Sequence, residues 1–504
     1  MERACGILMH ITSLPSPYGI GTLGKAAYEF ADFLKEAGHK YWQVLPVGPT
    51  SIGDSPYQSF SSFAGNPYMI DLDMLEEEGL LKKEEYENAD FGGHPLYVDY
   101  GKMYENRFDV LKKAYERFDI ANDDYVDFCV DNAYWLDDYA VFMTAKKAFG
   151  SENSWAQWKD RDMRDHRPIA IRAFSAVHAR EIGFYKFMQY MFFKQWKALK
   201  EYVNDLGIKF IGDAPIYVAL DSADAWGKRE LFKFDDSGVK PTFVAGCPPD
   251  YFSEDGQLWG NPLYDWDKIK KTGYKWWIDR LSNMAKIFDM IRIDHFRGFE
   301  AYYAIPYGDE NARGGHWKKG PDMDFINAVK GAMGDFPIIA EDLGLITDEV
   351  RLMLDNSGYP GMKVLQFAFS GGSDNAYLPH NHVKNCVVYS GTHDNDTLLG
   401  WFEAAGDEEK QYFMDYTGAE DKSDVLDVTL RALYSSVADL CVVTMQDLLS
   451  SGSEFRMNTP STLGNNWKFR APKDYEEKVS AKKLNKLAKI YDRALVCEAE
   501  EEAE

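Results

Sequence analysis

Basic residues are scarce in this 504-residue chain, in which 56 lysines and arginines face 81 aspartates and glutamates, for a net charge of −25. No stretch of the sequence is rich in lysine or arginine. A protein that binds a polyanion needs positive charge to displace the counterions of its partner. We therefore expect neither nucleic acid nor an acidic membrane surface as a partner.

Cysteine is scarce too, and long hydrophobic runs are absent. The sequence has no Cys-x-x-Cys pair, no zinc-type histidine spacing, no His-Glu-x-x-His motif and no calcium loop, so we predict no metal site. It also has no run of 18 apolar residues and no signal-like start. These absences predict a soluble, cytoplasmic protein whose six cysteines are reduced: Cys5, Cys129, Cys247, Cys386, Cys441 and Cys497.

A glycine motif near the N-terminus raises the alternative of a nicotinamide cofactor. Gly19-Ile-Gly21-Thr-Leu-Gly24 matches the dinucleotide fingerprint G-x-G-x-x-G. In a true fingerprint the first glycine follows a strand directly, and an acidic residue ends the next strand. Here eight residues with two prolines separate the motif from the first predicted strand, and the second strand ends in Leu45-Pro-Val-Gly. We therefore reject the nucleotide interpretation.

What the sequence does contain is an alternation of strands and helices. Short apolar runs of strand type recur along the chain, and segments of helical pattern or length separate most of them. Such alternation is typical of a parallel sheet covered by helices, and eight strands predict a (β/α)8 barrel, of the α/β class. The predicted strands are residues 5–10, 41–45, 208–213, 290–294, 337–341, 362–367, 386–390 and 441–446.

A large insertion is predicted after the second strand. Residues 50–200 begin as a loop and then become acidic, aromatic and helical, without the alternation of a strand. The clearest helix of the chain ends this block, with an apolar stripe from Phe184 to Leu206 and Gly207 as its stop. We predict a single barrel domain over residues 1–504, with a helical insertion subdomain at 50–200 and a solvated acidic tail at 498–504.

Polar side chains gather where the predicted strands end. Active sites of (β/α)8 barrels lie at the C-terminal ends of several strands. One aspartate after a strand is more often a helix N-cap, but four strand ends of this kind favour an active site. The residues are Asp213 on the third strand, Arg292 and Asp294 on the fourth, Glu341 and Asp342 on the fifth, and His393 and Asp394 after the seventh.

The surroundings of three carboxylates suggest different roles for them. Asp294 shares a strand face with Arg292, whose charge keeps a carboxylate ionised, as a nucleophile requires; alone, such a pair is more often structural. Glu341 leaves an apolar run that raises its pKa, as a general acid requires. Asp394, preceded by His393, is suited to bind sugar hydroxyls without transferring a proton. Together these are the groups that glycoside chemistry uses.

The order Asp, Glu, Asp on strands four, five and seven resembles the α-amylase clan. Over nearly the whole chain, longer motifs resemble the 4-α-glucanotransferases (amylomaltase or disproportionating enzyme) of glycoside hydrolase family 77. These motifs are the segment from Gly6 to Gly21, Asp54-Ser-Pro-Tyr-Gln58, Gly212-Asp-Ala-Pro-Ile-Tyr217, Ala245 to Phe252, Gly256 to Pro262, Arg292-Ile-Asp-His-Phe-Arg-Gly298, Ala340-Glu-Asp-Leu-Gly344 and Thr392-His-Asp-Asn-Asp396.

The resemblance implies a retaining transfer of an α-1,4-glucan segment to the 4-hydroxyl of an acceptor glucan or glucose, through a covalent glycosyl-enzyme. It implies Asp294 as nucleophile, Glu341 as acid/base and Asp394 as transition-state stabiliser. Maltooligosaccharides or glucans of the starch and glycogen type are the implied partners, and no cofactor is implied. The implied substrate-binding residues are Tyr57, Asp213, Trp259, Arg292, His295, His393 and Asn466.

Two details of the resemblance concern loops. Cys247 falls in the loop that folds over the acceptor side in the family, and Tyr251, Phe252 and Trp259 are aromatic groups suited to shield the site from water. Two other functions stay open beside the transferase. One is an α-glucan hydrolase with the same carboxylates, and the other is a non-catalytic glycan-binding protein, which would be expected to have lost a carboxylate.

Overall fold

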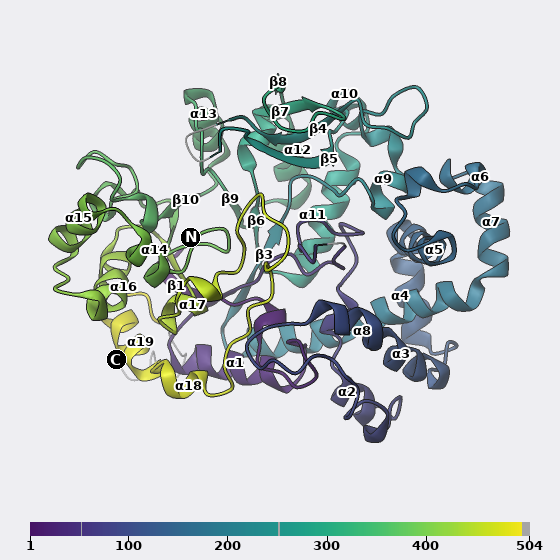
Figure 1. Ribbon diagram of the computed structural model, residues 1–504, viewed down its shortest axis with the longest axis horizontal. Helices are drawn as coiled ribbons and strands as arrows, with labels where there is room; N and C mark the ends of the chain where they lie inside the picture. Colours follow the sequence, from purple (N-terminus) through teal and green to yellow (C-terminus); the bar gives the residue numbers. More distant parts are fainter. Residues whose placement is uncertain (52, 250–252, 496–504) are drawn as a thin grey trace.

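The computed structural model describes residues 1–51, 53–249 and 253–495 (Figure 1). The predicted tail at 498–504 and the aromatic residues Tyr251 and Phe252 therefore lie outside the described residues. At the centre is an eight-stranded sheet in the order β10-β11-β12-β1-β2-β3-β6-β9. Its strands are β1 (Ala4–Leu8), β2 (Tyr41–Gln43), β3 (Lys209–Ala214), β6 (Met290–Ile293), β9 (Ile338–Ala340), β10 (Gly361–Val364), β11 (Cys386–Tyr389) and β12 (Leu440–Thr444).

The sheet curls into a barrel. Each pair of neighbouring strands in it is parallel. The two end strands, β9 and β10, also approach each other, since the Ala340 N–H donates to the Pro360 carbonyl at 2.9 Å. Strands of a parallel sheet are buried on both faces, and β1, β11 and β12 are buried throughout. The predicted (β/α)8 barrel is confirmed.

All the predicted barrel strands are present, with differences at their ends. The sixth and eighth strands, for example, end earlier than predicted. After β10 the chain turns into the 3-10 helix η7 (Leu365–Phe367), and after β12 it enters α17 (Met445–Leu448). The Thr444 hydroxyl caps α17 by accepting from the Asp447 N–H at 3.1 Å, which starts a helix where the apolar pattern still suggests a strand.

Helices cover the outside of the barrel. The first, α1 (Lys25–Glu36), buries Ala27, Phe30 and Leu34 on one face, as its spacing predicts. The others outside the inserted block are α9 (Ala223–Gly227), α10 (Trp266–Lys271), α11 (Lys275–Ile287), α12 (Asp322–Met333), α13 (Asp348–Ser357), α14 (Leu398–Ala404), α15 (Asp407–Thr417), α16 (Val425–Ser435), α18 (Tyr475–Lys478) and α19 (Ala481–Ile490).

A block of helices lies between β2 and β3, at the right of Figure 1. Its last helix packs on the barrel: the Trp196 indole N–H donates to the Ile287 carbonyl at 2.9 Å, and its ring lies 5.2 Å from that of Phe210 on β3. The division of the chain into a barrel and a subdomain at 50–200 stays a prediction. The helices are α2 (Leu72–Glu77), α3 (Tyr100–Arg117), α4 (Asp123–Asp131), α5 (Ala133–Phe149), α6 (Arg161–Arg164), α7 (Pro168–Val177) and α8 (Ala179–Asp205).

A second sheet, which the sequence analysis did not predict, lies at the top of Figure 1. It is antiparallel, in the order β5-β4-β7-β8. Because Cys247 is the last residue of β4, its expected place in a loop is wrong. The strands are β4 (Phe243–Cys247), β5 (Gln257–Pro262), β7 (Ala301–Pro306) and β8 (His316–Lys319).

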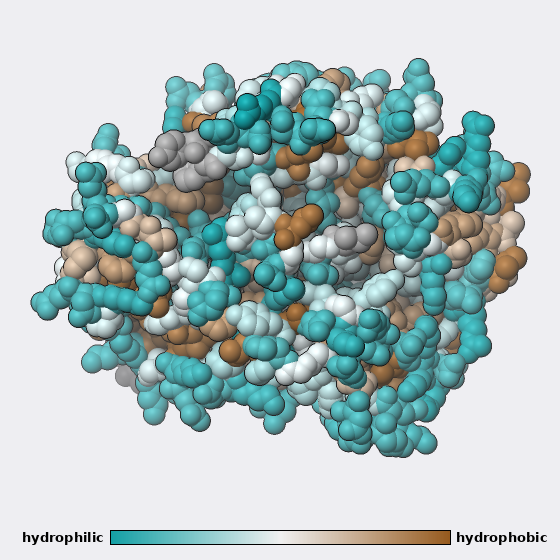
Figure 2. Space-filling view, viewed as in Figure 1, coloured by the Kyte–Doolittle hydropathy of each residue, from teal (hydrophilic) through white to brown (hydrophobic). Residues whose placement is uncertain are grey.

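The surface agrees with the strongly charged composition. Hydrophilic side chains cover most of the face drawn in Figure 2, and hydrophobic ones are scattered among them. Within the three described ranges, no helix combines the length and the apolar character needed to cross a membrane.

Candidate active site

Arg292 on β6 is the central contact of the site. It pairs with Asp213 in the register of β3 and β6, which brings the two side chains together at the strand ends. One guanidinium nitrogen of Arg292 donates to both Asp213 oxygens, at 2.8 and 2.7 Å, and another donates to Asp294 at 3.0 Å. The Tyr57 hydroxyl donates to Asp213 at 2.7 Å. The predicted pairing of Arg292 with Asp294 is confirmed, and Asp213 and Tyr57 join it.

The pKa of Asp294 differs from the expectation. Burial raises the pKa of Asp294 to about 6, although Arg292 acts to lower it. Arg292 shares its charge between two carboxylates, and the Asp213 charge itself adds to the rise. We expected the arginine charge to have the largest effect on this pKa and to lower it. Burial has the larger effect, yet Asp294 is still ionised above about pH 6.

Glu341 directly follows β9 and is 9% exposed. Its two oxygens accept from different loops: Oε2 from the His295 N–H at 2.7 Å, and Oε1 from the Leu343 N–H at 2.8 Å. Burial and the neighbouring Asp294 carboxylate raise the pKa of Glu341 to about 7. The predicted upward shift is confirmed, and the group can both give and take a proton near neutral pH.

Asp394 has the opposite character. Although burial acts to raise it, the pKa of Asp394 lies well below its ordinary value because His393 and Asn458 favour the charged form. The Asn458 amide donates to Asp394 Oδ1 at 2.6 Å, and His393 Nε2 lies 3.4 Å from Oδ2. Although burial acts to lower it, the pKa of His393 is raised by the Asp394 carboxylate. The contacts of Asp394 therefore favour its charged form, which accepts hydrogen bonds and has no proton to give.

Aromatic rings form one side of the site. The rings of Tyr57 and His393 stack with centroids 4.9 Å apart and planes 17° apart. The Trp467 ring lies 5.7 Å from Tyr57 and 5.9 Å from His393. Because Trp467 comes from the C-terminal segment, that segment lies over the strand ends, where Figure 1 draws it in yellow.

Trp259 and His295 form another contact of the site. The ring of Trp259, on β5, meets that of His295 edge to face at 4.9 Å. The Trp259 indole N–H donates to the Gln257 side chain at 3.0 Å, which sets the orientation of the ring. The second sheet thus contributes Trp259 to the site, next to the residue that donates to Glu341.

Asn466 is the predicted residue with the least direct connection to the others. Its side-chain oxygen accepts from the Thr459 N–H at 3.0 Å, and its amide donates to the Thr462 carbonyl at 3.1 Å. These bonds shape its own loop, just before Trp467. Contact of Asn466 with a sugar stays a prediction.

Three residues of the site were not singled out by the sequence analysis for any role of their own: Arg456, Asn458 and Trp467. Arg456 donates to the Asp394 carbonyl at 2.5 Å and to the Asn458 carbonyl at 2.6 Å. Trp467 directly follows the predicted Asn466 in an Asn-Trp pair that the resemblance includes. The only signal for Arg456 and Asn458 was a loop-like, polar segment after the last strand, which does not indicate what it contacts.

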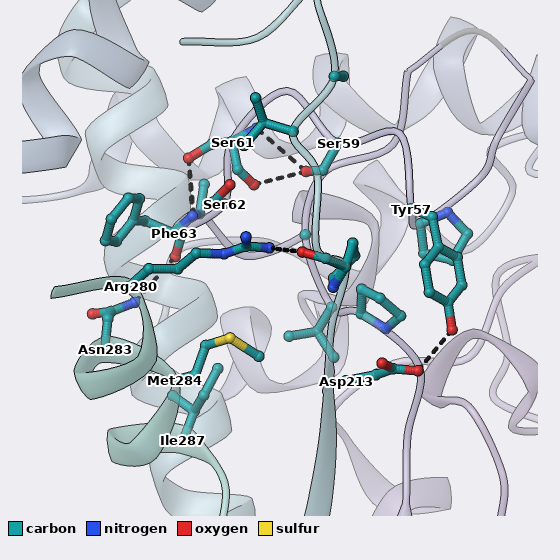
Figure 3. A pocket seen from close by; sticks show the side chains of 18 of the residues that line it. Tyr57, Ser59, Ser61, Ser62, Phe63, Asp213, Arg280, Asn283, Met284 and Ile287 are labelled. Carbon is teal, nitrogen blue, oxygen red and sulfur yellow. Dashed lines mark hydrogen bonds between the residues drawn. The ribbon is translucent and has the colours of Figure 1, made fainter. Parts of the chain in front are cut away.

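A small cavity of about 50 Å³ lies behind Tyr57 and Asp213, between the segment 56–64 and α11 (Figure 3). Arg280 crosses it and donates to the Pro215 carbonyl at 2.7 Å. One buried water needs about 10–15 Å³ of such space. The cavity therefore has room for a few waters but not for a sugar ring. Among the described residues, no three His, Cys, Asp or Glu side chains are grouped as metal ligands.

Comparisons with known proteins agree with this geometry. The family model described as 4-alpha-glucanotransferase, of glycoside hydrolase family 77, matches residues 9–475. A 4-alpha-glucanotransferase of Clostridium butyricum is 48% identical over 96% of this chain and 100% of its own. That of Thermus thermophilus is 46% identical over 93% of this chain and 95% of its own.

Solved structures of amylomaltases are also similar to this chain. The amylomaltase from Streptococcus agalactiae, in complex with acarbose, is 42% identical, with a TM-score of 0.94 over 98% of this chain and 100% of its own. Amylomaltase from Corynebacterium glutamicum, at 18% identity and a TM-score of 0.75, supports the fold alone. The chain belongs to the 4-alpha-glucanotransferases, enzymes of glycoside hydrolase family 77.

Proposed function

We propose that the chain acts as a 4-alpha-glucanotransferase on α-1,4-glucans, with Asp294 as nucleophile, Glu341 as acid/base and Asp394 as transition-state stabiliser. The observation that carries the assignment is the contrast among these carboxylates. The pKa of Asp394 lies well below its ordinary value, whereas that of Asp294 is raised to about 6 and that of Glu341 to about 7. Sites that need an acid and a base separate their pKa values in this way.

In the first step, an Asp294 oxygen attacks C1 of a glucosyl unit in the donor. The bond from C1 to the bridging oxygen breaks, and Glu341 gives its proton to that oxygen as the chain beyond it departs. The product is a glycosyl ester on Asp294, with inverted configuration at C1. Positive charge develops on the sugar in the transition state, and Asp394 stabilises it.

In the second step, Glu341, now ionised, takes the proton of the 4-hydroxyl of an incoming glucan or glucose. The oxygen of that hydroxyl attacks C1, and the bond to Asp294 breaks. The second inversion restores the α-linkage, so that the enzyme is retaining. Transfer competes with hydrolysis, and we propose that Trp259 and His295, whose rings are in contact, favour a sugar acceptor over water.

The substrates we propose are maltooligosaccharides and glucans of the starch and glycogen type. The complex of the Streptococcus agalactiae relative with acarbose supports a sugar-binding site in this fold. In this chain the supporting features are the Tyr57–His393 stack and the polar groups around it, which offer a flat face and hydrogen bonds to a sugar ring. We propose Tyr57, Asp213, Arg292, His393 and Asn466 as further substrate-binding residues.

The test is incubation of the purified protein with maltotriose alone, beside an Asp294→Asn variant. We expect glucose together with a ladder of longer maltooligosaccharides from the wild type, and no products from the variant. Chromatography by chain length measures both. Glucose and maltose with nothing longer than the substrate would indicate a hydrolase, and no change at all would indicate a glycan-binding protein.

A further inference from the structure

Arg297 belongs to the charged motif after β6, yet the proposed chemistry does not use it. It lies in the 3-10 helix η6 (Phe296–Phe299) and is 5% exposed. Among the ion pairs of the residues that the structure describes, none includes Arg297. Burying a guanidinium outside an ion pair costs free energy. The other contacts of Arg297 must therefore hold it in this position.

Two contacts define the position of Arg297. Its guanidinium carbon lies 3.8 Å from the ring centroid of Trp317, on β8, in a cation–π stack. One of its nitrogens donates to the Leu345 carbonyl at 2.5 Å. The Trp317 ring is in turn braced by the Tyr303 ring at 5.2 Å, on the neighbouring strand β7. Arg297 therefore ties the second sheet to the loop that follows β9.

Arg297 lies in the segment after β6 and bonds to the loop after β9, and both of these segments donate to Glu341. The His295 N–H, two residues before Arg297, donates to one oxygen, and the Leu343 N–H, two residues before Leu345, donates to the other. The His295 backbone has φ of +51°, a left-handed conformation that is unusual outside glycine. Such a conformation persists only where the surrounding contacts maintain it.

We propose that Arg297, stacked on Trp317, is a positioning residue that fixes the two backbone donors of Glu341. The inference rests on the proposed function, in which Glu341 is the acid/base. Two N–H donors favour the carboxylate over the acid. The contacts of Arg297 with Trp317 and Leu345 form what we call the clamp. When the clamp is loosened, the two N–H donors move away from Glu341. The Glu341 carboxylate is then less stabilised and loses its orientation toward the bridging oxygen.

Other groups also act on Glu341, and the test leaves them unchanged. The charged or titratable groups that face it are Arg292 on β6, Asp294 directly after β6, and Tyr377 from the segment after β10. Arg297 itself faces Glu300, Cys247 and Tyr217. Since Trp317 carries no charge, substituting it separates positioning from electrostatics.

The experiment compares Arg297→Lys, Arg297→Ala, Trp317→Ala and Trp317→Phe with the wild type, in steady-state transfer from maltotriose across pH. We expect kcat to fall about 10- to 100-fold in Arg297→Ala with KM nearly unchanged, as misplacement of a catalytic group by about 1 Å produces. The basic limb of kcat/KM should move up by about half to one pH unit as donors are lost. Trp317→Ala should shift it in the same direction by less, and Trp317→Phe should stay close to wild type.

A second readout separates positioning from misfolding. Release of fluoride from α-maltosyl fluoride in the first turnover needs no proton donor, so the Arg297 variants should retain most of that rate. A misfolded site would lose both rates together. The matched control is Arg313→Ala, because Arg313 is 58% exposed and pairs with the exposed Asp255.

Three outcomes would overturn the proposal. The first is a wild-type pH profile in Arg297→Lys, which would leave only the charge as the cause. The second is an unshifted basic limb in Trp317→Ala. The third is an equal loss of rate with maltotriose and with α-maltosyl fluoride. A Glu341→Gln variant keeps the two proposals apart. If it transfers from maltotriose at the wild-type rate, the proposed function fails; if it is inactive while the Arg297 variants are normal, only the clamp fails.

Discussion

The carboxylates of Asp294, which is partly buried, and of Glu341, which is buried, both depend on the charge of one arginine. Arg292 also neutralises Asp213, so neither catalytic candidate has a full positive charge to itself. Burial raises both pKa values, and the shared arginine charge does not offset it. At the scale of single residues, the site is therefore built at the expense of stability, as buried functional charges commonly are.

This cost predicts a pH-dependent effect of Glu341→Gln. The pKa of Glu341 rises from 4.5 to about 7 on folding, so the native state binds the extra proton between those values and loses stability as pH rises through that window. At pH 8 the variant should exceed the wild type in free energy of unfolding by up to about 3 kcal/mol, at 1.36 kcal/mol per pH unit. At pH 4, where the glutamate is protonated in both states, the two should agree.

Urea unfolding at pH 4 and pH 8 measures this difference. The control is Glu310→Gln, an exposed residue of the second sheet's turn. A gain in stability that is the same at both pH values would show that packing, and not ionisation, is responsible.

A second prediction at this scale concerns Asn458. Its amide donates to Asp394, and a lost hydrogen bond to a charged group costs about 1.5–3 kcal/mol. We expect kcat in Asn458→Ala to fall at least about tenfold, and to fall further in Asn458→Asp, where a second carboxylate would repel the first. Kinetics with maltotriose measure this, with the exposed Asn88→Ala as control. Unchanged kcat in both Asn458 variants would mean that the orientation of Asp394 does not depend on the Asn458 amide.

At the scale of elements, the barrel and the second sheet differ in how visible they are in the sequence. Strands β1 and β12 are buried throughout and appear as continuous apolar runs. Strand β8 is largely exposed, and β5 is buried only at its end, so neither has a clear pattern. The second sheet nevertheless places Trp259 and Trp317, on which the site and the proposed clamp depend.

The helix α8 joins the inserted block to the barrel, and Trp196 tests that connection. It is 1% exposed and packs between Phe210 and Phe288, with its indole N–H bonded to Ile287. Trp196→Ala should lower the free energy of unfolding by about 3–5 kcal/mol, and Trp196→Phe by less. Lys197→Ala, on the exposed side of the same helix, should change it by less than about 0.5 kcal/mol. Equal effects of the Trp196→Ala and Lys197→Ala substitutions in urea unfolding would contradict the packing argument.

At the scale of the whole molecule, one hydrophobic core runs through the barrel and the inserted helices. The same cluster of buried residues includes Val442 from β12, Trp42 from β2 and Leu136 from α5. Domains that fold separately have their own cores. The prediction of a single domain follows from this continuity.

That prediction has a direct measurement. Unfolding by urea should give one transition, with the same midpoint by far-ultraviolet circular dichroism and by tryptophan fluorescence. A fragment of residues 50–200, expressed alone, should lack a cooperative transition because α8 loses its barrel partners. Two separated transitions in the full chain, or a cooperatively folded fragment, would instead indicate an independent subdomain.

The sequence by itself determined the barrel, its strands and the acidic and basic side chains at their ends. Buried parallel strands require continuous apolar runs, and polar groups at their ends interrupt those runs, so both features are visible in local pattern. Asp294, Glu341 and Asp394 could be singled out in this way, and the family motifs named their neighbours.

Only the tertiary structure decided how these groups behave. In the fold, Arg292 bonds to both Asp213 and Asp294, and burial raises the pKa of Asp294 where a low value was expected. The fold also brings Asn458 and Trp467 from the C-terminal segment into the site. It also placed Arg297 and Trp317 beside the donors of Glu341. Ionisation and orientation depend on burial and on distances between residues far apart in the chain, and periodicity along the sequence carries no record of either.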